Sequence, residues 1–164
     1  MRKGLKSLSP RVPQVGEAMR GEEGHLPYLL SQAHAAMRLA LERALADLKV
    51  TAPQFSILTM IDSYPGLSGA ELARLSMLTP QTINLIVKNL ERDGLIAKSP
   101  DDVHGRILRL QATAAGRALR KKCRERANRI ETRVSAGLAA SEEKVVRRWL
   151  VQLASEMHAR PERA

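Results

Sequence analysis

The stretch that decides the fold, residues 67–116, reads LSGAELARLSMLTPQTINLIVKNLERDGLIAKSPDDVHGRILRLQATAAG. Near its start Ser68 precedes Glu71 by three residues, which is a capping-box pattern for the start of a helix. Further along, Thr79 followed by Pro80 is typical of a second N-cap with a proline in the first turn. The stretch therefore predicts two short helices in succession, one after each cap.

The second of these helices has an apolar face and a polar face. Ile83, Ile86, Val87 and Leu90 recur at steps of three or four, which indicates a buried stripe. Gly94 follows as a left-handed cap that ends the helix. The residues that face elsewhere are Gln81, Thr82, Asn84, Leu85, Lys88 and Asn89. This helix is therefore anchored on one side and free to contact another molecule on the other.

A hairpin is predicted after these two helices, and a third short helix is predicted before them. Residues 95–98 and 106–111 alternate as two strands around the polar loop 99–105, which predicts a β-hairpin. Upstream, Thr51 and Pro53 open a further short helix. Three short helices followed by a hairpin form a winged helix-turn-helix, in which the second helix of the motif enters the major groove of DNA.

Longer amphipathic helices are predicted on both sides of this lobe, over residues 26–48 and 119–138 and from Ser141 onward. The apolar faces of the first and the last of these helices are too wide for so small a lobe to cover, so we expect two chains to interlock through them. The fold class is mainly α with a small β-hairpin wing. The predicted organisation is a flexible N-terminal arm (1–24), a dimerisation helix (25–50), the winged helix-turn-helix lobe (51–112) and C-terminal dimerisation helices (113–164).

The charge of the chain favours a nucleic-acid partner. Lys and Arg number 27 against 17 Asp and Glu, a formal net charge of +10, and basic residues attract phosphates. Aromatic residues make up only 2%, too few for the stacking platforms of single-strand binders. Eight basic residues crowd into residues 117–133, which fits either a DNA contact or a solvated helix. The expected partner is double-stranded DNA.

Candidate DNA contacts lie at two places. On the reading helix, Gln81, Thr82, Asn84 and Lys88 can bond base edges or phosphates, and the helix start at Thr79 suits a phosphate. On the wing, the loop that ends at Gly105 would bring Arg106 toward the backbone or the minor groove.

These residues resemble the MarR family of bacterial transcriptional regulators. The resemblance covers about residues 26–158 and is most specific in the phrase Leu90-Glu91-Arg92-Asp93-Gly94-Leu95-Ile96 and in Thr113 with Gly116 after the wing. It implies a winged-helix homodimer whose first and last helices interlock. It also implies binding to a palindromic operator, usually in repression, and release of DNA by a small aromatic or anionic ligand or by an oxidant.

Position by position, the resemblance makes Arg106 the wing arginine, and two departures concern the DNA contacts. His104 stands where the family usually has the aspartate that braces this arginine, a role that Asp101 or Asp102 could take. Leu85 stands where arginine is frequent, which fits either contact with a thymine methyl or weaker phosphate binding. In addition, Ala112 replaces the usual leucine before Thr113.

By analogy with the family, an effector would lie in the crevice between the dimerisation helices and the lobe. The candidate ligand-binding residues are His34, Arg38, Met60 and Tyr64, and Arg38 could pair with a carboxylate or with a phosphate of a CoA thioester. Cys123, the single cysteine, lies on an apolar stripe, which favours a buried thiol over a redox sensor.

Other functional classes receive no support from motifs. We expect no enzyme, because the sequence has no glycine-rich phosphate loop and no recognisable nucleophile signature. No metal site and no cofactor are expected, since the four histidines lack ligand spacing. Without a signal peptide or a run of about 18 apolar residues, a cytoplasmic location away from membranes is expected. The alternative function is a ligand-independent architectural DNA-binding protein.

Overall fold

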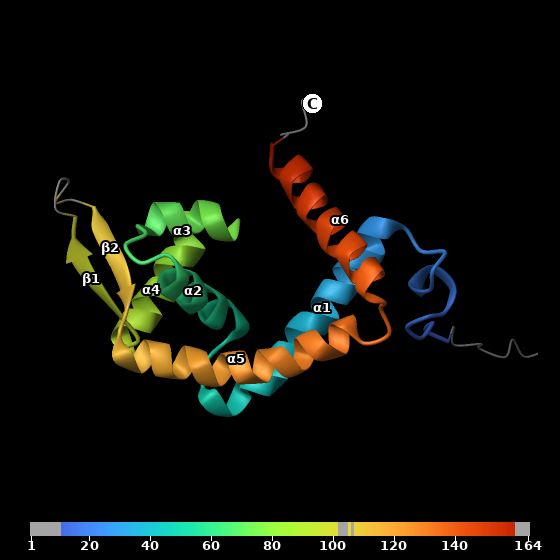
Figure 1. Ribbon diagram of the computed structural model, residues 1–164, viewed down its shortest axis with the longest axis horizontal. Helices are drawn as coiled ribbons and strands as arrows, with labels where there is room; N and C mark the ends of the chain where they lie inside the picture. Colours follow the sequence, from blue (N-terminus) through green and yellow to red (C-terminus); the bar gives the residue numbers. More distant parts are fainter. Residues whose placement is uncertain (1–10, 102–104, 106, 160–164) are drawn as a thin grey trace, which may run out of the picture. The chain divides into compact units, whose positions relative to one another are not determined.

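The computed structural model describes residues 11–101, 105 and 107–159 (Figure 1). They form two compact units, which divide between Ala40 and Leu41. The elements in chain order are η1 (Ala18–Arg20), α1 (Leu26–Leu45), η2 (Ala46–Leu48), α2 (Ala52–Ser63), α3 (Gly69–Ser76), α4 (Pro80–Arg92), β1 (Ile96–Pro100), β2 (Leu108–Ala112), α5 (Ala114–Ser135) and α6 (Ala140–Ala159). The mainly helical fold with one hairpin is confirmed.

Each helix of the lobe begins at the cap that the sequence predicts. The Thr51 hydroxyl accepts the Gln54 amide at 3.3 Å, and the Gln54 side chain bonds back to the Thr51 amide, forming a capping box. Ser68 and Glu71 form the same reciprocal pair at the start of α3. Because these caps satisfy backbone N–H groups that a helix start leaves unpaired, they fix where the helices begin.

Helices α2, α3 and α4 pack around one core. The anchoring face of α4 is buried as predicted, with Ile83 and Leu90 fully enclosed. The turn between α3 and α4 passes through Met77, which has a left-handed backbone (φ 55°) and ends α3. The remaining members of this core come from α2, α3, α4 and the hairpin: Ile57, Leu58, Ile61, Leu72, Ala73, Ile86, Val87, Ile96, Leu110 and Ala112.

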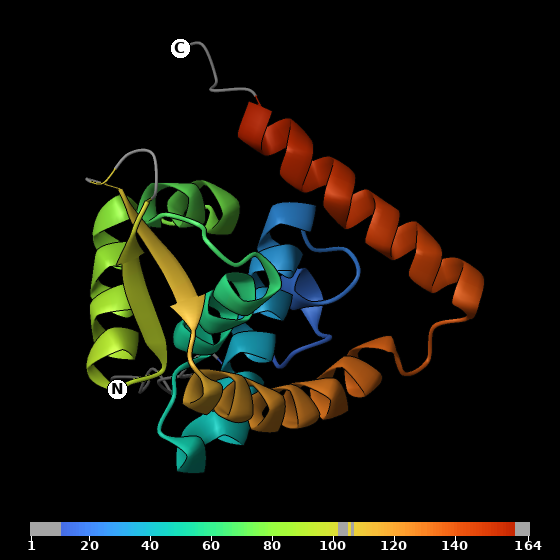
Figure 2. The same ribbon diagram turned by 60° about the vertical axis from the view of Figure 1, so that its left-hand side comes forward.

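The hairpin lies against this core, as Figure 2 shows. Strand β1 pairs antiparallel with β2, from Ile96 opposite Ala112 to Pro100 opposite Leu108, and β1 contacts α4 whereas β2 contacts α2 and α3. The predicted start of the first strand, at residue 95, is wrong by one residue. The reason is that the Leu95 amide bonds to the Leu90 carbonyl and so completes the end of α4. The ladder extends outward to residue 100 instead.

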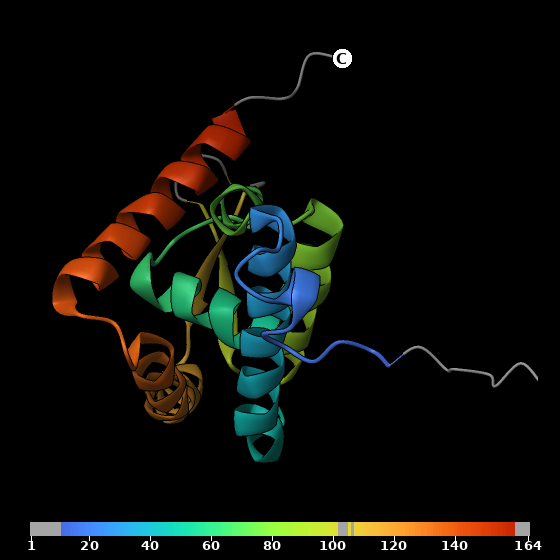
Figure 3. The same cartoon turned by 90° about the vertical axis from the view of Figure 1, so that its right-hand side faces the viewer.

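Helix α5 passes beside α2, and Figure 3 looks almost along its axis. Here a second cluster forms from Leu45, Val50, Phe55 and Cys123. Cys123 is fully buried, as the sequence predicted, and burial raises the pKa of its thiol. The first long helix is shorter than predicted, because α1 tightens at residue 45 into η2 and ends at Lys49 in a left-handed conformation.

Candidate nucleic-acid interface

The outer face of α4 carries the predicted reading residues. Gln81, Thr82, Asn84 and Lys88 are all exposed, on the side opposite the buried stripe. Leu85 lies among them with 62% of its surface exposed. Since the stripe locks the helix in place, these side chains are presented in a fixed arrangement. The exposure of this face is what sequence reasoning predicted, and its contact with DNA remains a prediction.

The start of α4 offers fewer free amides than the sequence suggested. The Thr79 hydroxyl accepts the Thr82 amide at 3.2 Å and lies 2.9 Å from the Thr82 hydroxyl. Pro80 has no N–H to offer. Among the described residues of this first turn, that leaves the Gln81 amide to meet a phosphate oxygen, together with the positive end of the helix dipole.

Both predicted wing contacts, His104 and Arg106, lie outside the described residues. The base of the wing is described. There the Asp101 amide donates to the Ile107 carbonyl at 2.8 Å, which closes the loop. The Asp101 carboxylate accepts Arg109 Nε at 2.5 Å. The Asp101 carboxylate, which the sequence suggests as an acidic partner for the wing arginine, is therefore bound by Arg109 on β2.

Sequence reasoning missed Arg109. Its Nη1 also donates to the Gly66 carbonyl at 3.2 Å and to Glu71 at 3.1 Å. The bond to Asp101 is the main cause of a raised pKa at Arg109. The Ser68 amide and hydroxyl, helped by Arg109, lower the pKa of Glu71. The only signal in the sequence was a charged residue inside a strand whose neighbours, Leu108 and Leu110, are apolar.

The basic stretch on α5 is only partly available to a ligand. Arg117 donates to the Ala112 carbonyl at 2.6 Å, and Arg120 pairs with Asp62. Arg126 pairs with Asp47, and Arg124 lies over the ring of Phe55. The other four basic residues are exposed: Lys121, Lys122, Arg129 and Arg133. Half of the stretch therefore holds α5 to its own chain.

The predicted ligand-binding residues are divided between the two units. His34 and Arg38 lie on the exposed surface of α1. On α2 and just after it, Met60 packs partly buried against the core, whereas Tyr64 is exposed. A ligand site formed by all four stays a prediction.

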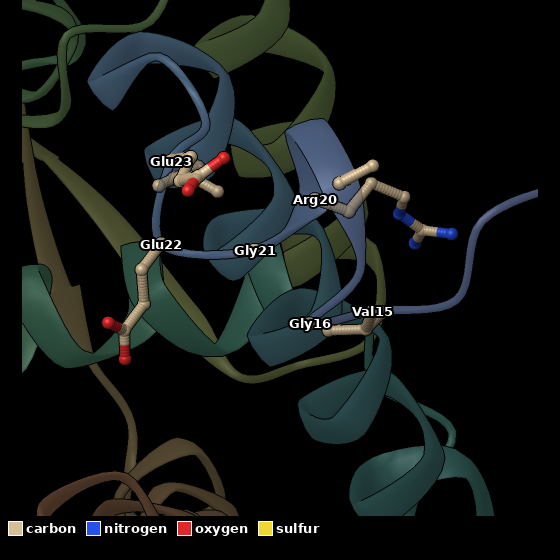
Figure 4. A pocket seen from close by; sticks show the side chains of 8 residues that line it. Val15, Gly16, Arg20, Gly21, Glu22 and Glu23 are labelled. Atoms are coloured by element: carbon tan, nitrogen blue, oxygen red, sulfur yellow. The ribbon is translucent and has the colours of Figure 1, made fainter.

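A hollow in the N-terminal unit is lined by other residues, including Val15, Gly16, Arg20 and Leu29 (Figure 4). Arg20 is held by the Pro13 carbonyl and by Gln32. The Glu22 carboxylate points away from the Arg20 guanidinium. The charged side chains of this hollow therefore do not converge on one ligand. In the part of the chain that the structure describes, no three His, Cys, Asp or Glu side chains group as a metal site.

Comparison with known proteins identifies the family. The MarR family model matches residues 50–108. The HTH-type transcriptional repressor Rv2887 of Mycobacterium tuberculosis is 37% identical over 135 residues, which cover 82% of this chain and 97% of that protein. This chain belongs to the MarR family. It is therefore a DNA-binding transcriptional regulator of the winged helix-turn-helix class, and the resemblance seen in the sequence is confirmed.

Solved structures agree with this assignment. The Rv2887 protein in complex with p-aminosalicylic acid superposes with a TM-score of 0.63 at 36% identity, over 79% of this chain and 98% of that one. The same protein in complex with DNA gives a TM-score of 0.62 at 36% identity, over 79% and 97% of the two chains. The family consists of regulators rather than enzymes. None of the described helices combines the length and the apolar character needed to cross a membrane.

Proposed function

We propose that this MarR-family regulator is a repressor that binds a pseudo-palindromic operator as a homodimer and is released by a small anionic aromatic ligand. The observation that carries the proposal is the reading face of α4, exposed on one side and anchored by Ile83, Ile86, Val87 and Leu90 on the other. A helix held in this way can enter the major groove without rearrangement.

The homodimer is supported by two exposed apolar faces. None of the described residues of α6 is buried, although its apolar side chains include Val146, Trp149 and Leu150. On α1, Leu26, Met37 and Leu39 are exposed as well. Contiguous exposed apolar side chains on the surface of a water-soluble protein indicate an interface with another molecule. Two-fold pairing of the chains would present two copies of α4 to two half-sites.

The ligand class is supported by the relative. The Rv2887 protein has been solved with salicylic acid and with p-aminosalicylic acid, both aromatic carboxylic acids. For this chain we infer a ligand of the same chemistry, an aromatic acid or its CoA thioester, with Arg38 as a partner for the carboxylate or phosphate. Such a ligand weakens DNA binding only if it favours a dimer arrangement that fits DNA less well.

A salt-dependent titration tests the proposal. The purified protein is titrated against its own upstream DNA and against a scrambled duplex of equal length. We expect a preference of about a thousandfold, because base contacts add to the phosphate contacts that both duplexes share. Equal affinity for both duplexes would contradict an operator and would favour the architectural alternative.

The same titration, repeated with ligands, tests release. Salicylic acid, p-aminosalicylic acid and their CoA thioesters form the panel, and salicylamide is the matched control because it lacks the carboxylate. We expect at least one of the acids or thioesters, and not the amide, to lower operator affinity. If no member of the panel changes the affinity, the aromatic-acid proposal is wrong while the operator proposal stands.

A further inference from the structure

Arg109 connects the hairpin to the helix-turn-helix at two points and joins the two sides of the hairpin at a third. Its Nε donates to Asp101 at the base of the wing loop, and its Nη1 donates to Glu71 on α3 and to the Gly66 carbonyl in the turn before α3. A guanidinium is a rigid planar fork, so bonds made from two of its nitrogens fix direction as well as distance. One side chain therefore sets the hairpin against the first helix of the motif.

The partners of Arg109 are themselves held in place. The Asp101 side chain is only 14% exposed. Glu71 is fixed by the Ser68 amide and hydroxyl, both at 2.7 Å, as part of the capping box of α3. Without the guanidinium, the Asp101 and Glu71 carboxylates would each lose a charged hydrogen bond, which is costly for partly buried acids.

A backbone connection runs beside the side-chain one. The Gly66 amide donates to the Leu110 carbonyl and the Leu110 amide donates to the Leu67 carbonyl, both at 3.0 Å. Arg109 is next in sequence to Leu110, so its bonds protect this junction between β2 and the turn before α3. The Arg109 side chain is 30% exposed and both of its bonding nitrogens face acceptors within the chain. Two of its three nitrogens are therefore used to position other groups of the chain.

We propose that Arg109 is a positioning residue for operator recognition, which holds the hairpin so that the wing and α4 engage the same half-site. The inference rests on the proposed function and deepens it. His104 stands where the family has its bracing aspartate. In this chain the bracing of the hairpin comes from the strand itself, through Arg109 with Asp101 and Glu71.

The first arm of the test needs no DNA. Arg109→Met keeps the aliphatic stem and removes the guanidinium. The matched control is Arg120→Met, since Arg120 is also 30% exposed and its Nε lies 2.6 Å from Asp62, which is 15% exposed. We expect amide hydrogen exchange at Asp101 and Leu110 to become about tenfold faster in Arg109→Met and not in Arg120→Met, because the loss of charged hydrogen bonds frees the junction.

The second arm measures operator affinity on duplexes shortened from both ends. Wild type should lose affinity when the outer base pairs that the wing reaches are removed. Arg109→Met should bind the long duplex about tenfold more weakly than wild type does and should bind the short duplex with the same affinity as wild type. The variant would therefore no longer bind the long duplex more tightly than the short one. Arg120→Met should keep that advantage. Arg109→Lys, whose single ammonium cannot span both carboxylates, should regain only part of it.

Two results would overturn the proposal. One is an Arg109→Met protein that keeps the wild-type advantage of the long duplex. The other is equal loss on both duplexes, which indicates general damage rather than misplacement of the hairpin. If wild type binds its upstream DNA no more tightly than the scrambled duplex, the proposed function is wrong. The amide-exchange measurement then decides by itself whether Arg109 holds the hairpin. Unchanged exchange at Asp101 and Leu110 would then overturn the positioning role.

Discussion

Leu85 is the residue on the reading face that is hardest to explain by structure alone. It is 62% exposed, although the buried stripe of α4 lies on the other side of the helix. A leucine side chain cannot form a hydrogen bond with a phosphate or with the polar groups of a base edge. The apolar group that the major groove offers is the C5-methyl of thymine. We therefore interpret Leu85 as a reader of that methyl group.

Replacement of thymine by deoxyuridine in the operator tests this interpretation. Burial of one methyl group contributes about 0.8 kcal/mol, so removal of the contacted methyl should weaken binding by wild type about fourfold. Leu85→Ala should bind both duplexes equally. Lys88→Ala is the control on the same face, and it should weaken binding while keeping the methyl preference. The interpretation is wrong if no single thymine replacement changes the affinity of wild type.

At the scale of elements, the start of α5 joins the end of the hairpin to the end of α4. Thr113 donates its amide to the Leu95 carbonyl at 3.0 Å and its hydroxyl to the Gly94 carbonyl at 2.8 Å, and it accepts the Gly116 amide. Gly116 faces the Leu95 carbonyl so closely that a Cβ there would overlap the oxygen. The glycine is therefore required by close approach of backbones and not by its own conformation.

Gly116→Ala should lower the free energy of unfolding by about 1–3 kcal/mol, since the overlap is with a backbone atom that cannot move cheaply. Gly69→Ala is the matched control. Gly69 also lies in the first turn of a helix, but a Cβ there meets nothing closer than the Asn84 side chain at 3.9 Å. Urea denaturation of both variants measures the difference. Equal stability of the two variants would contradict the overlap.

Local signals predicted the elements well because the decisive interactions span three or four residues. Thr51, Ser68 and Thr79 are caps whose partners lie three residues on, so spacing alone revealed them. The predicted limits of the strands are less accurate. The Leu95 amide bonds to the Leu90 carbonyl at the end of α4, and the alternation of apolar and polar residues cannot reveal such a bond.

Long-range partners could not be predicted in the same way. Arg109 meets Glu71, 38 positions away, and Arg126 meets Asp47, 79 positions away. Nothing in the local pattern distinguishes these arginines from solvated ones. For the same reason the sequence allows two interpretations of the basic stretch on α5, and the structure shows that half of it makes contacts within the chain.

For the whole molecule, the main question is what covers α6. This helix is amphipathic, yet none of its described residues is buried. Arg147 ties it to α5 through Glu131, a pair exposed to water that contributes little. A second chain that covers Trp149 and Leu150 would account for the apolar face.

Trp149 is the single tryptophan and so reports on this face directly. We expect wild type to sediment at roughly twice the chain mass of 18.1 kDa, with blue-shifted tryptophan emission. Leu150→Glu should sediment as one chain with red-shifted emission, because it would bury a charge in the interface. Gln152→Glu adds the same charge outside the apolar stripe of Val146, Trp149 and Leu150 and should behave as wild type. A wild-type protein that sediments as one chain would contradict the dimer.

The junction of Gly66 and Leu67 with Leu110, locked by Arg109, also bears on how operators evolve. Arg109 braces the hairpin against α3, so the proposed contacts of α4 and of the wing with DNA would lie a fixed number of base pairs apart. An insertion within a half-site would separate these two contacts. Operators of this regulator should therefore keep the length of each arm.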